Sequence, residues 1–540
     1  MKTVVAGALG ECVHVAGVSN FLHLAEMAGW RTVFLGPAVP IDRFIQAAKD
    51  EKADLIGVSY RLTPETGERL LGEFAEAASE LHDQGVRFAF GGTPPVAAKA
   101  QKLGAFFEAC FDGSQPPDEI LAYLRGEGSQ PASVDRYPQT TVERIQWKAP
   151  FPLLRHHFGL PSMEATLKGI QQISEAKALD VISLGIDQDA QENFFHPERQ
   201  NPRARGAGGV PVRSAADYQA LYEASRCGNF PLMRTYSGTD DFIALAELYL
   251  QTIHNAWCAI PLFWFNQMDG RGPIALEESI REHQQVMAWY GSRGVPVELN
   301  EPHHWGMRDA PDVVYVTSAF LAAWNAKAFG VRDYIAQMMF NSPAGLSDAM
   351  DLAKMAAILE MIAPLEDDRF RIWRQTRTGL LSYPLEDNAA RAHLAASIYL
   401  QMGLKPHIVH IVGHTEADHA ATAEDVINAS QMARRVIATA LQGQPDLLAD
   451  PAIQQRKAHL IAEARLTLTA IRSLSHAEDP LTDPAALAEA VRCGILDAPQ
   501  LKNNRFAAGT IRTGIVRGGC EALDEQGEVL PESARLANYL

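Results

Sequence analysis

The chain has 540 residues, 47% of them hydrophobic and 21% charged, with a net charge of −17. This length predicts two or three domains, and the acidic balance argues against nucleic acid or a membrane surface as a partner. No run is apolar over the length of a membrane span, and the six cysteines lack CxxC spacing. Since the first residues lead directly into a strand, we expect no signal peptide. We therefore expect a cytoplasmic protein with reduced thiols.

The first 125 residues alternate short apolar runs with amphipathic segments. The runs cover residues 3–8, 31–35, 55–59, 87–90 and 106–111. Continuous apolar strands separated by helices are typical of a parallel sheet that is covered on both faces. We expect residues 1–125 to form a doubly wound, flavodoxin-like α/β domain, with its ligand site at the carboxyl ends of the strands.

Three short motifs fall at such strand ends. They are Cys12-Val13-His14-Val15-Ala16-Gly17 after the first strand, Ser59-Tyr60-Arg61-Leu62 at the end of the third, and Gly91-Gly92-Thr93 at the end of the fourth. A neutral imidazole such as that of His14 is a good metal ligand. The hydroxyl of Ser59 can bond a ligand, and glycines allow a ligand close to the backbone because they have no Cβ.

Together these motifs resemble the cobalamin-binding domain of mutases and methionine synthase, whose pattern is Asp-x-His-x-x-Gly, then Ser-x-Leu, then Gly-Gly. The resemblance implies a cobalamin cofactor, with His14 as the lower axial ligand to cobalt. The cofactor-binding residues that it implies in this domain are Cys12, His14, Gly17, Ser59, Leu62, Gly91, Gly92 and Thr93. Two positions depart from the pattern. Cys12 replaces the Asp that orients the imidazole, and Arg61 stands where the family has Leu, with Leu62 one residue later.

The composition changes after residue 125. Residues 126–145 begin with a stretch rich in Gly, Ser, Pro and Gln, which predicts a linker. Strand-like runs then recur at 179–186, 231–236, 259–266, 296–300, 334–341, 370–376 and 407–412, with an eighth near 147–154. Helical patterns separate these runs. This number of βα units predicts a (β/α)8 TIM barrel over residues 146–440, and residues 441–540 predict a helical and loop-rich extension over one barrel end.

The barrel half resembles the large catalytic subunit of glutamate mutase (methylaspartate mutase), and the N-terminal domain is similar to the small cobalamin-binding subunit of that enzyme. The matching stretches are 231–239, 245–247, 301–302, 319–323, 330–331, 413–424, 494–499, 508–510 and 516–517. The resemblance implies that the two subunits are fused here. It also implies an adenosylcobalamin-dependent isomerase that rearranges the carbon skeleton of a small carboxylic or amino acid by a radical mechanism.

Five barrel residues are candidates for the catalytic site, which a TIM barrel places at the carboxyl ends of its strands. Glu416 aligns with a family glutamate that contacts the adenosyl ribose, so it is also a candidate for cofactor binding. The family binds two substrate carboxylates with three arginines, and this sequence offers at most two, Arg155 and Arg234. Asp269 or Glu301 could hold an ammonium group.

The substrate expected from these differences is a small acid other than glutamate. A dicarboxylate needs guanidinium partners for both carboxylates, and the family's amine ligands fall near Phe265 and Asp269, where they are not kept. We expect a smaller or less charged acid held by one arginine. The candidate walls of its pocket are Phe194, Phe195, Phe265 and Trp305.

Two other functions stay open. A corrinoid methyltransferase would use the same cobalamin domain to move a methyl group between a donor and an acceptor. A cobalamin-binding protein without catalytic activity is the third possibility. As partners we expect a small-molecule acid and a second copy of the chain in a homodimer, and neither nucleic acid nor membrane.

Overall fold

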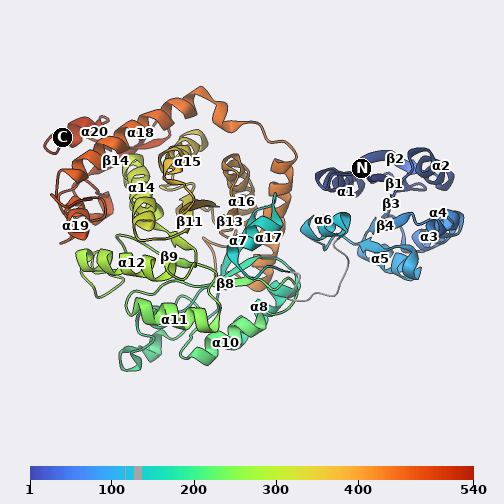
Figure 1. Ribbon diagram of the computed structural model, residues 1–540, viewed down its shortest axis with the longest axis horizontal. Coiled ribbons are helices and arrows are strands. Elements are labelled where there is room, and N and C mark those ends of the chain that lie inside the picture. Colours follow the sequence, from blue (N-terminus) through green and yellow to red (C-terminus); the bar gives the residue numbers. More distant parts are fainter. Residues whose placement is uncertain (116, 127–136) are drawn as a thin grey trace. The chain divides into compact units, whose positions relative to one another are not determined.

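The computed structural model describes residues 1–115, 117–126 and 137–540 (Figure 1). The chain divides into two compact units, Met1–Pro131 and Ala132–Leu540. Residues 127–136 of the predicted linker lie outside the described residues. The last residues of that linker belong to helix α7 (Thr141–Lys148), so the predicted linker extends too far into the second unit.

The N-terminal unit is a five-stranded parallel sheet with the strand order β2-β1-β3-β4-β5. Its strands are β1 (Thr3–Leu9), β2 (Arg31–Val39), β3 (Leu55–Tyr60), β4 (Arg87–Gly92) and β5 (Ala109–Phe111). Its helices are α1 (Ala16–Met27), α2 (Ile41–Glu51), α3 (Pro64–Ala77), α4 (Ser79–Asp83), α5 (Pro94–Gln101) and α6 (Pro117–Arg125). This is the flavodoxin-like order, and it confirms the predicted fold class of this unit.

The burial of the strands explains why the sequence specifies this sheet. Every residue of β1 is buried, because helices cover both faces of a doubly wound sheet. At Gly57 of β3, an added Cβ would lie 3.0 Å from the Ala6 side chain and 3.2 Å from the ring of Phe21. Glycine at this position therefore lets helix α1 pack closely on the sheet.

The second unit contains eight parallel strands in the order β8-β7-β6-β13-β12-β11-β10-β9. They are β6 (Leu153–Phe158), β7 (Val181–Leu184), β8 (Leu232–Arg234), β9 (Cys258–Ile260), β10 (Val297–Leu299), β11 (Asp333–Met339), β12 (Arg371–Arg377) and β13 (Ile408–His410). The N–H of Ala256 donates to the Met233 carbonyl (2.8 Å), and the N–H of Ser237 donates to the Ala259 carbonyl (3.3 Å). These bonds bring β8 beside β9, so the ring is a nearly closed barrel, as predicted.

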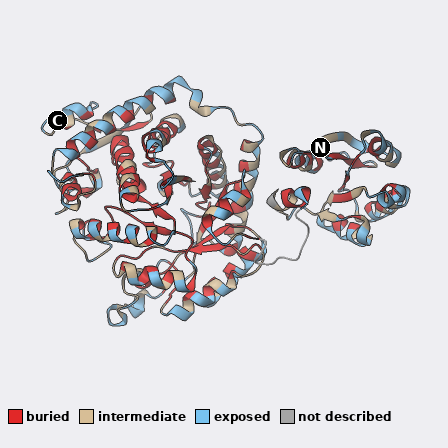
Figure 2. Ribbon diagram, viewed as in Figure 1, coloured by how far each residue is buried: buried red, intermediate tan, exposed pale blue. Residues whose placement is uncertain are grey.

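Helices surround this barrel, and their inner faces are buried together with the strands (Figure 2). The helices between strands are α8 (Met163–Glu175), α9 (Gln188–Glu192), α10 (Ala215–Ala224), α11 (Phe242–Thr252), α12 (Leu276–Gly291), α13 (Glu301–Gly306), α14 (Asp312–Ala328), α15 (Asp348–Ile362) and α16 (Asp387–Gln401), and α17 (Ala423–Leu441) follows β13. The first strand differs from the prediction. Residues 147–148 belong to α7, and β6 runs from Leu153 to Phe158.

The inside of the barrel is apolar in one layer and polar in the next. The apolar layer includes Leu153, Val181, Leu232, Trp257, Ala259, Ile335, Trp373 and Ile408. Two residues further along β6 and β8, Arg155 and Arg234 are each only 1% exposed. Since side chains alternate along a strand, these arginines point to the same interior as Leu153 and Leu232, one layer nearer the carboxyl ends of the strands.

The C-terminal extension comprises helices α18 (Pro451–Arg472), α19 (Pro484–Arg492) and α20 (Glu532–Arg535) and the hairpin of β14 (Arg512–Val516) and β15 (Gly519–Leu523). Helix α18 packs along α14 and α15, and α19 packs against α12. These contacts place α18 and α19 on the outer helices of the barrel. We had expected this extension to lie over one end of the barrel. Among the described residues, no helix has the length and apolarity needed to cross a membrane.

Candidate functional site

The N-terminal unit contains a cavity of about 440 Å³ beside the carboxyl edge of its sheet. Its floor is formed by small residues in the middle of three strands, Ala6, Gly57 and Ala89, and its walls by helix α1 and Ile120 of α6. The other lining residues are His14, Gly17, Val18, Asn20, Phe21, Leu24, Val58, Ser59, Arg61, Phe90, Gly91, Gly92, Thr93, Pro94, Phe111, Asp112 and Gly113. This volume is in the range of small-molecule sites.

Six of the predicted cofactor residues line this cavity. His14 and Gly17 lie at its edge, in the loop before α1 and in the first turn of that helix, and both are exposed. The others are Ser59, Gly91, Gly92 and Thr93. An added Cβ at Gly91 would meet no atom within 4 Å. A ligand can therefore lie directly against the backbone here.

Cys12 and Leu62 do not line the cavity. Cys12 is fully buried, and its main chain joins the loop to both neighbouring strands. Its N–H donates to the Leu9 carbonyl (3.2 Å), and its carbonyl accepts from the N–H of Ala38 (2.9 Å). Leu62 is 41% exposed, whereas Arg61 faces the cavity. A role of Cys12 or Leu62 in cofactor binding stays a prediction.

Sequence reasoning missed the apolar walls of this cavity. Val18, Phe21 and Leu24 of α1 face it together with Phe111 and Ile120. The spacing of the three α1 residues puts them on one face of the helix, and that spacing was the available signal. An apolar slot with an exposed imidazole at its edge suits the nucleotide tail of a cobalamin, and the role of His14 as the lower ligand to cobalt stays a prediction.

The barrel holds a second candidate site, built around buried charges. Arg155 donates through Nη1 to Glu298 Oε2 (2.8 Å) and to Gln375 Oε1 (3.0 Å). Arg234 Nη2 lies 3.9 Å from the same Glu298 oxygen, and Trp257 Nε1 donates to it at 2.6 Å. Burial raises the pKa of Glu298, but the two guanidinium groups outweigh that effect and hold the pKa below its usual value.

A third arginine, Arg377, ends β12 and is also buried. The sequence analysis considered Arg155 and Arg234 and left out Arg377, which lies one residue beyond the predicted strand; which arginines bind a substrate stays a prediction. In the described residues, Arg155 Nε, Arg234 Nε and Nη1, and Arg377 Nε have no hydrogen-bond partner. Since buried donors are rarely left unpaired in proteins, these atoms mark a place for an anionic ligand.

Histidines surround the arginines. His157 Nε2 is within hydrogen-bonding distance of Arg155 Nη2 (3.1 Å) and Tyr236 Oη (3.2 Å). Both partners can donate, so we assign the acceptor role to His157 Nε2 and the proton to Nδ1. The pKa of His157 lies well below 6.5, first because of burial and then because of the arginine charges. His303, His304 and His410 have lowered pKa values for the same reasons, so the group is neutral at pH 7.

Two predicted catalytic carboxylates accept hydrogen bonds from backbone N–H groups. Glu301, the first residue of α13, accepts from the N–H groups of Leu262 (2.6 Å) and Phe263 (3.0 Å) and from Trp305 Nε1 (2.8 Å). Asp269 accepts from the N–H groups of Phe265 (3.2 Å) and Asn266 (3.0 Å). Burial raises the pKa of Glu301 to about 7. Both carboxylates thus hold the loop after β9, and their catalytic role stays a prediction.

Glu416 lies in the loop after β13, where it is exposed. Partial burial raises the pKa of its carboxyl, and the positive charge of Arg377 acts against that rise.

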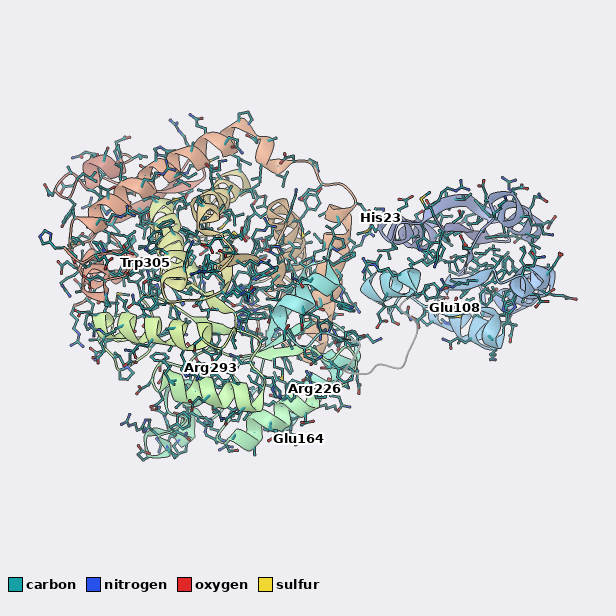
Figure 3. The ribbon with its side chains drawn as sticks, viewed as in Figure 1. His23, Glu108, Glu164, Arg226, Arg293 and Trp305 are labelled. Carbon is teal, nitrogen blue, oxygen red and sulfur yellow. The ribbon has the colours of Figure 1, made fainter. Side chains whose placement is uncertain are left out.

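The predicted aromatic walls divide into two groups. Phe265 and Trp305 are buried, and Trp305 packs on Trp264 with ring centroids 4.8 Å apart inside the large unit (Figure 3). Phe195 is 42% exposed and contacts Phe194 edge to face. Trp305 therefore belongs to the packed core, and Phe195 lies at the surface.

The fold and cavity of the N-terminal unit define a cobalamin-binding module, and comparisons with known proteins agree. The B12 binding domain family matches residues 2–121. The dimethylamine corrinoid protein 3 of Methanosarcina mazei is 35% identical over 125 residues, which are 23% of this chain and 74% of that protein. The chain belongs to this cobalamin-binding family through its N-terminal unit.

Two further comparisons concern the same unit. The glutamate mutase sigma subunit 1 of Haloarcula marismortui is 28% identical over 127 residues, which are 23% of this chain and 84% of that protein. A solved structure of a cobalamin-binding protein from Desulfitobacterium hafniense has 21% identity and a TM-score of 0.21 and covers 23% of this chain and 58% of its own. Some relatives are matched over less of their length, such as the dimethylamine corrinoid protein of Methanosarcina barkeri, at 58%.

Proposed function

We propose that this chain is an adenosylcobalamin-dependent mutase that rearranges the carbon skeleton of a small acid other than glutamate. The observation that carries the proposal is the cationic layer inside the barrel. Arg155, Arg234 and Arg377 are buried there with Glu298 as their buried carboxylate. A barrel interior with this excess of positive charge suits an anionic substrate, because an unpaired buried charge is costly.

The hydrogen bonds suggest which arginines would bind the acid. Arg155 already donates to Glu298 and Gln375 and lies against His157. Among the described residues, Arg234 keeps two unpaired donors, Nε and Nη1, whereas Arg155 and Arg377 each keep an unpaired Nε. We assign the substrate carboxylates to Arg234 and Arg377, because Arg155 is already paired with Glu298. The sequence analysis expected one arginine to hold the acid. With two arginines available, the substrate can carry one or two carboxylates.

The carboxylates of the barrel argue against an amino acid. Asp269 and Glu301 accept backbone N–H groups, and Glu298 is bound by Arg155 and Trp257. None of these is left to pair with a substrate ammonium, whose burial without a counter-charge would be unfavourable. An acid without an amino group therefore fits better than glutamate.

When bound, adenosylcobalamin supplies a carbon-centred radical by homolysis of its cobalt–carbon bond. The protein binds and orients both partners and keeps solvent and other quenchers away. His14 would hold the cofactor from below, and Glu416 would bind the adenosyl ribose. The neutral histidines of the barrel can donate hydrogen bonds without adding charge.

The test is an isomerisation assay of the full chain loaded with adenosylcobalamin, in the dark and without oxygen. Glutamate and 3-methylaspartate are compared with dicarboxylates that lack an amino group and with monocarboxylates, and products are identified by mass spectrometry. We expect an isomer from an acid without an amino group, and none with Arg234→Met. Rapid interconversion of glutamate and 3-methylaspartate would refute the substrate proposal.

Corrinoid-dependent methyl transfer is a second candidate. It is favoured by the relatives named dimethylamine corrinoid proteins, which are 33% to 35% identical to the N-terminal unit. The discriminating assay follows an isotopically labelled methyl group from the methylcobalamin-loaded protein to candidate acceptors. Transfer without any isomerisation would replace the mutase proposal. A homodimer also remains a proposal, which light scattering of the purified chain would check.

A further inference from the structure

The rim of the cavity in the N-terminal unit carries a cation at a position where the family pattern has leucine. Arg61 follows directly after β3, lines the cavity and is exposed. Among the residues that the structure describes, it has no hydrogen-bond or ion-pair partner. A guanidinium group that lies beside an apolar slot and forms no ion pair is available to an anion.

The cavity has an apolar inner part and a polar rim, and these suit different parts of the cobalamin tail. The inner part is apolar, with Phe21, Leu24 and Phe90 beside the strand glycines. The polar side chains, such as those of Arg61 and Thr93, follow the strand ends. The tail of cobalamin carries an aromatic base joined through a ribose to a phosphodiester with one negative charge. If the base fills the apolar part, the phosphodiester is left at the rim.

The charge of the rim depends on Arg61. Asp112 also lines the cavity, and the hydroxyl and N–H of Ser114 donate to its carboxylate (2.6 and 3.0 Å). These bonds lower the pKa of Asp112, so it is ionised at neutral pH. Among the described residues that line the cavity, no other arginine or lysine would offset this negative charge for a phosphodiester at the rim.

We propose that Arg61 binds the phosphodiester of the cobalamin nucleotide tail, and that this chain uses the contact to recognise complete cobalamins. Guanidinium–phosphate pairs are charge-assisted and often bidentate. The proposal rests on cobalamin binding by the N-terminal unit and is independent of the reaction that the barrel catalyses.

The test compares two corrinoids that differ in the tail. Hydroxocobalamin carries the nucleotide and its phosphodiester, whereas diaquocobinamide lacks both. Each is titrated into the full chain and followed by its visible absorption spectrum. The variants are Arg61→Ala, Arg61→Lys and, as a matched control, Arg43→Ala. Arg43 is an exposed arginine of helix α2 that does not line the cavity.

We expect Arg61→Ala to weaken hydroxocobalamin binding about tenfold and to leave cobinamide binding and the thermal unfolding temperature unchanged. Arg61→Lys should recover part of the loss, and Arg43→Ala should behave as wild type. Salt at about 0.5 M should weaken hydroxocobalamin binding by wild type more than by Arg61→Ala.

Three results would overturn the proposal. If Arg61→Ala weakened the binding of both corrinoids equally, Arg61 would contact the corrin ring or support the fold, and not the phosphodiester. Unchanged hydroxocobalamin binding by Arg61→Ala would remove Arg61 from the site. A wild-type chain that binds neither corrinoid would refute cobalamin binding itself, and with it the proposed reaction, whereas the first two results would leave that reaction untouched.

Discussion

Replacing Glu298 by glutamine removes one negative charge from the barrel interior and changes the side-chain volume little. The Glu298 carboxylate accepts from Arg155 and Trp257 at 2.8 and 2.6 Å, and Arg234 lies 3.9 Å away. Glutamine keeps one acceptor oxygen, but its NH₂ group would point at one of these donors. The arginines would also lose their buried counter-charge.

The expected cost follows from that geometry. Removing one partner of a buried ion pair costs about 3–5 kcal/mol, because the remaining charge stays buried without compensation. We therefore expect Glu298→Gln to lower the free energy of unfolding of the large unit by at least about 3 kcal/mol. Urea unfolding, followed by tryptophan fluorescence and circular dichroism together, measures this change.

The matched control is Glu278→Gln on the exposed face of helix α12, which should change the free energy by less than about 0.5 kcal/mol. A loss below about 1 kcal/mol for Glu298→Gln would refute the buried-charge argument. A second measurement uses glutarate as a probe. If the arginines attract anions, glutarate should raise the urea midpoint of Glu298→Gln more than that of wild type, because a ligand that binds only the folded state stabilises it.

Three further predictions concern the cofactor and the barrel mouth. With bound cobalamin in its cobalt(II) form, electron paramagnetic resonance should show nitrogen coupling from a protein imidazole, and this coupling should disappear in His14→Ala; an unchanged spectrum would reject His14 as the ligand. Glu416→Gln should lower turnover of the true substrate about tenfold or more while cobalamin still binds, and unchanged kinetics would exclude Glu416 from the site. Burial raises the pKa of Glu301 to about 7 from an unfolded value of 4.5, so stability from this group is present at low pH and is lost as the pH rises through 7. Glu301→Gln should therefore flatten the change in urea midpoint between about pH 5 and pH 8, and curves parallel to wild type would contradict the raised pKa.

The N-terminal unit could be predicted closely because its physics is local. Each of its strands is short and largely apolar. Ser59 and Gly91 lie at the ends of β3 and β4, and His14 lies in the loop after β1. The apolar residues that line the cavity were harder to predict from the sequence. Phe21 and Leu24 read as ordinary core residues of a helix, since the sequence alone does not tell an apolar face that meets a neighbour from one that lines a cavity.

The first barrel strand was harder to place because its interior face is polar. Strand β6 alternates Leu153, Arg155 and His157 toward the inside, and such a strand lacks the apolar run that marks a buried strand. The amphipathic residues of α7, just before β6, gave a clearer hydrophobic pattern than β6 itself does, so the predicted strand began too early. Arg377 was missed because the predicted strand ended one residue before it, and β12 carries only two apolar residues, Ile372 and Trp373.

The roles of the barrel residues depend on partners that lie far away in the sequence. Arg155 and Glu298 are 143 residues apart and share a hydrogen bond through Nη1 of the arginine. Among the described residues, Arg155 keeps only Nε unpaired, whereas Arg234 keeps both Nε and Nη1. The sequence can count arginines, but it does not show which are already neutralised. Since Glu298 decides how much positive charge remains for a ligand, this glutamate sets the charge of the acid that the barrel can accept as much as the arginines do.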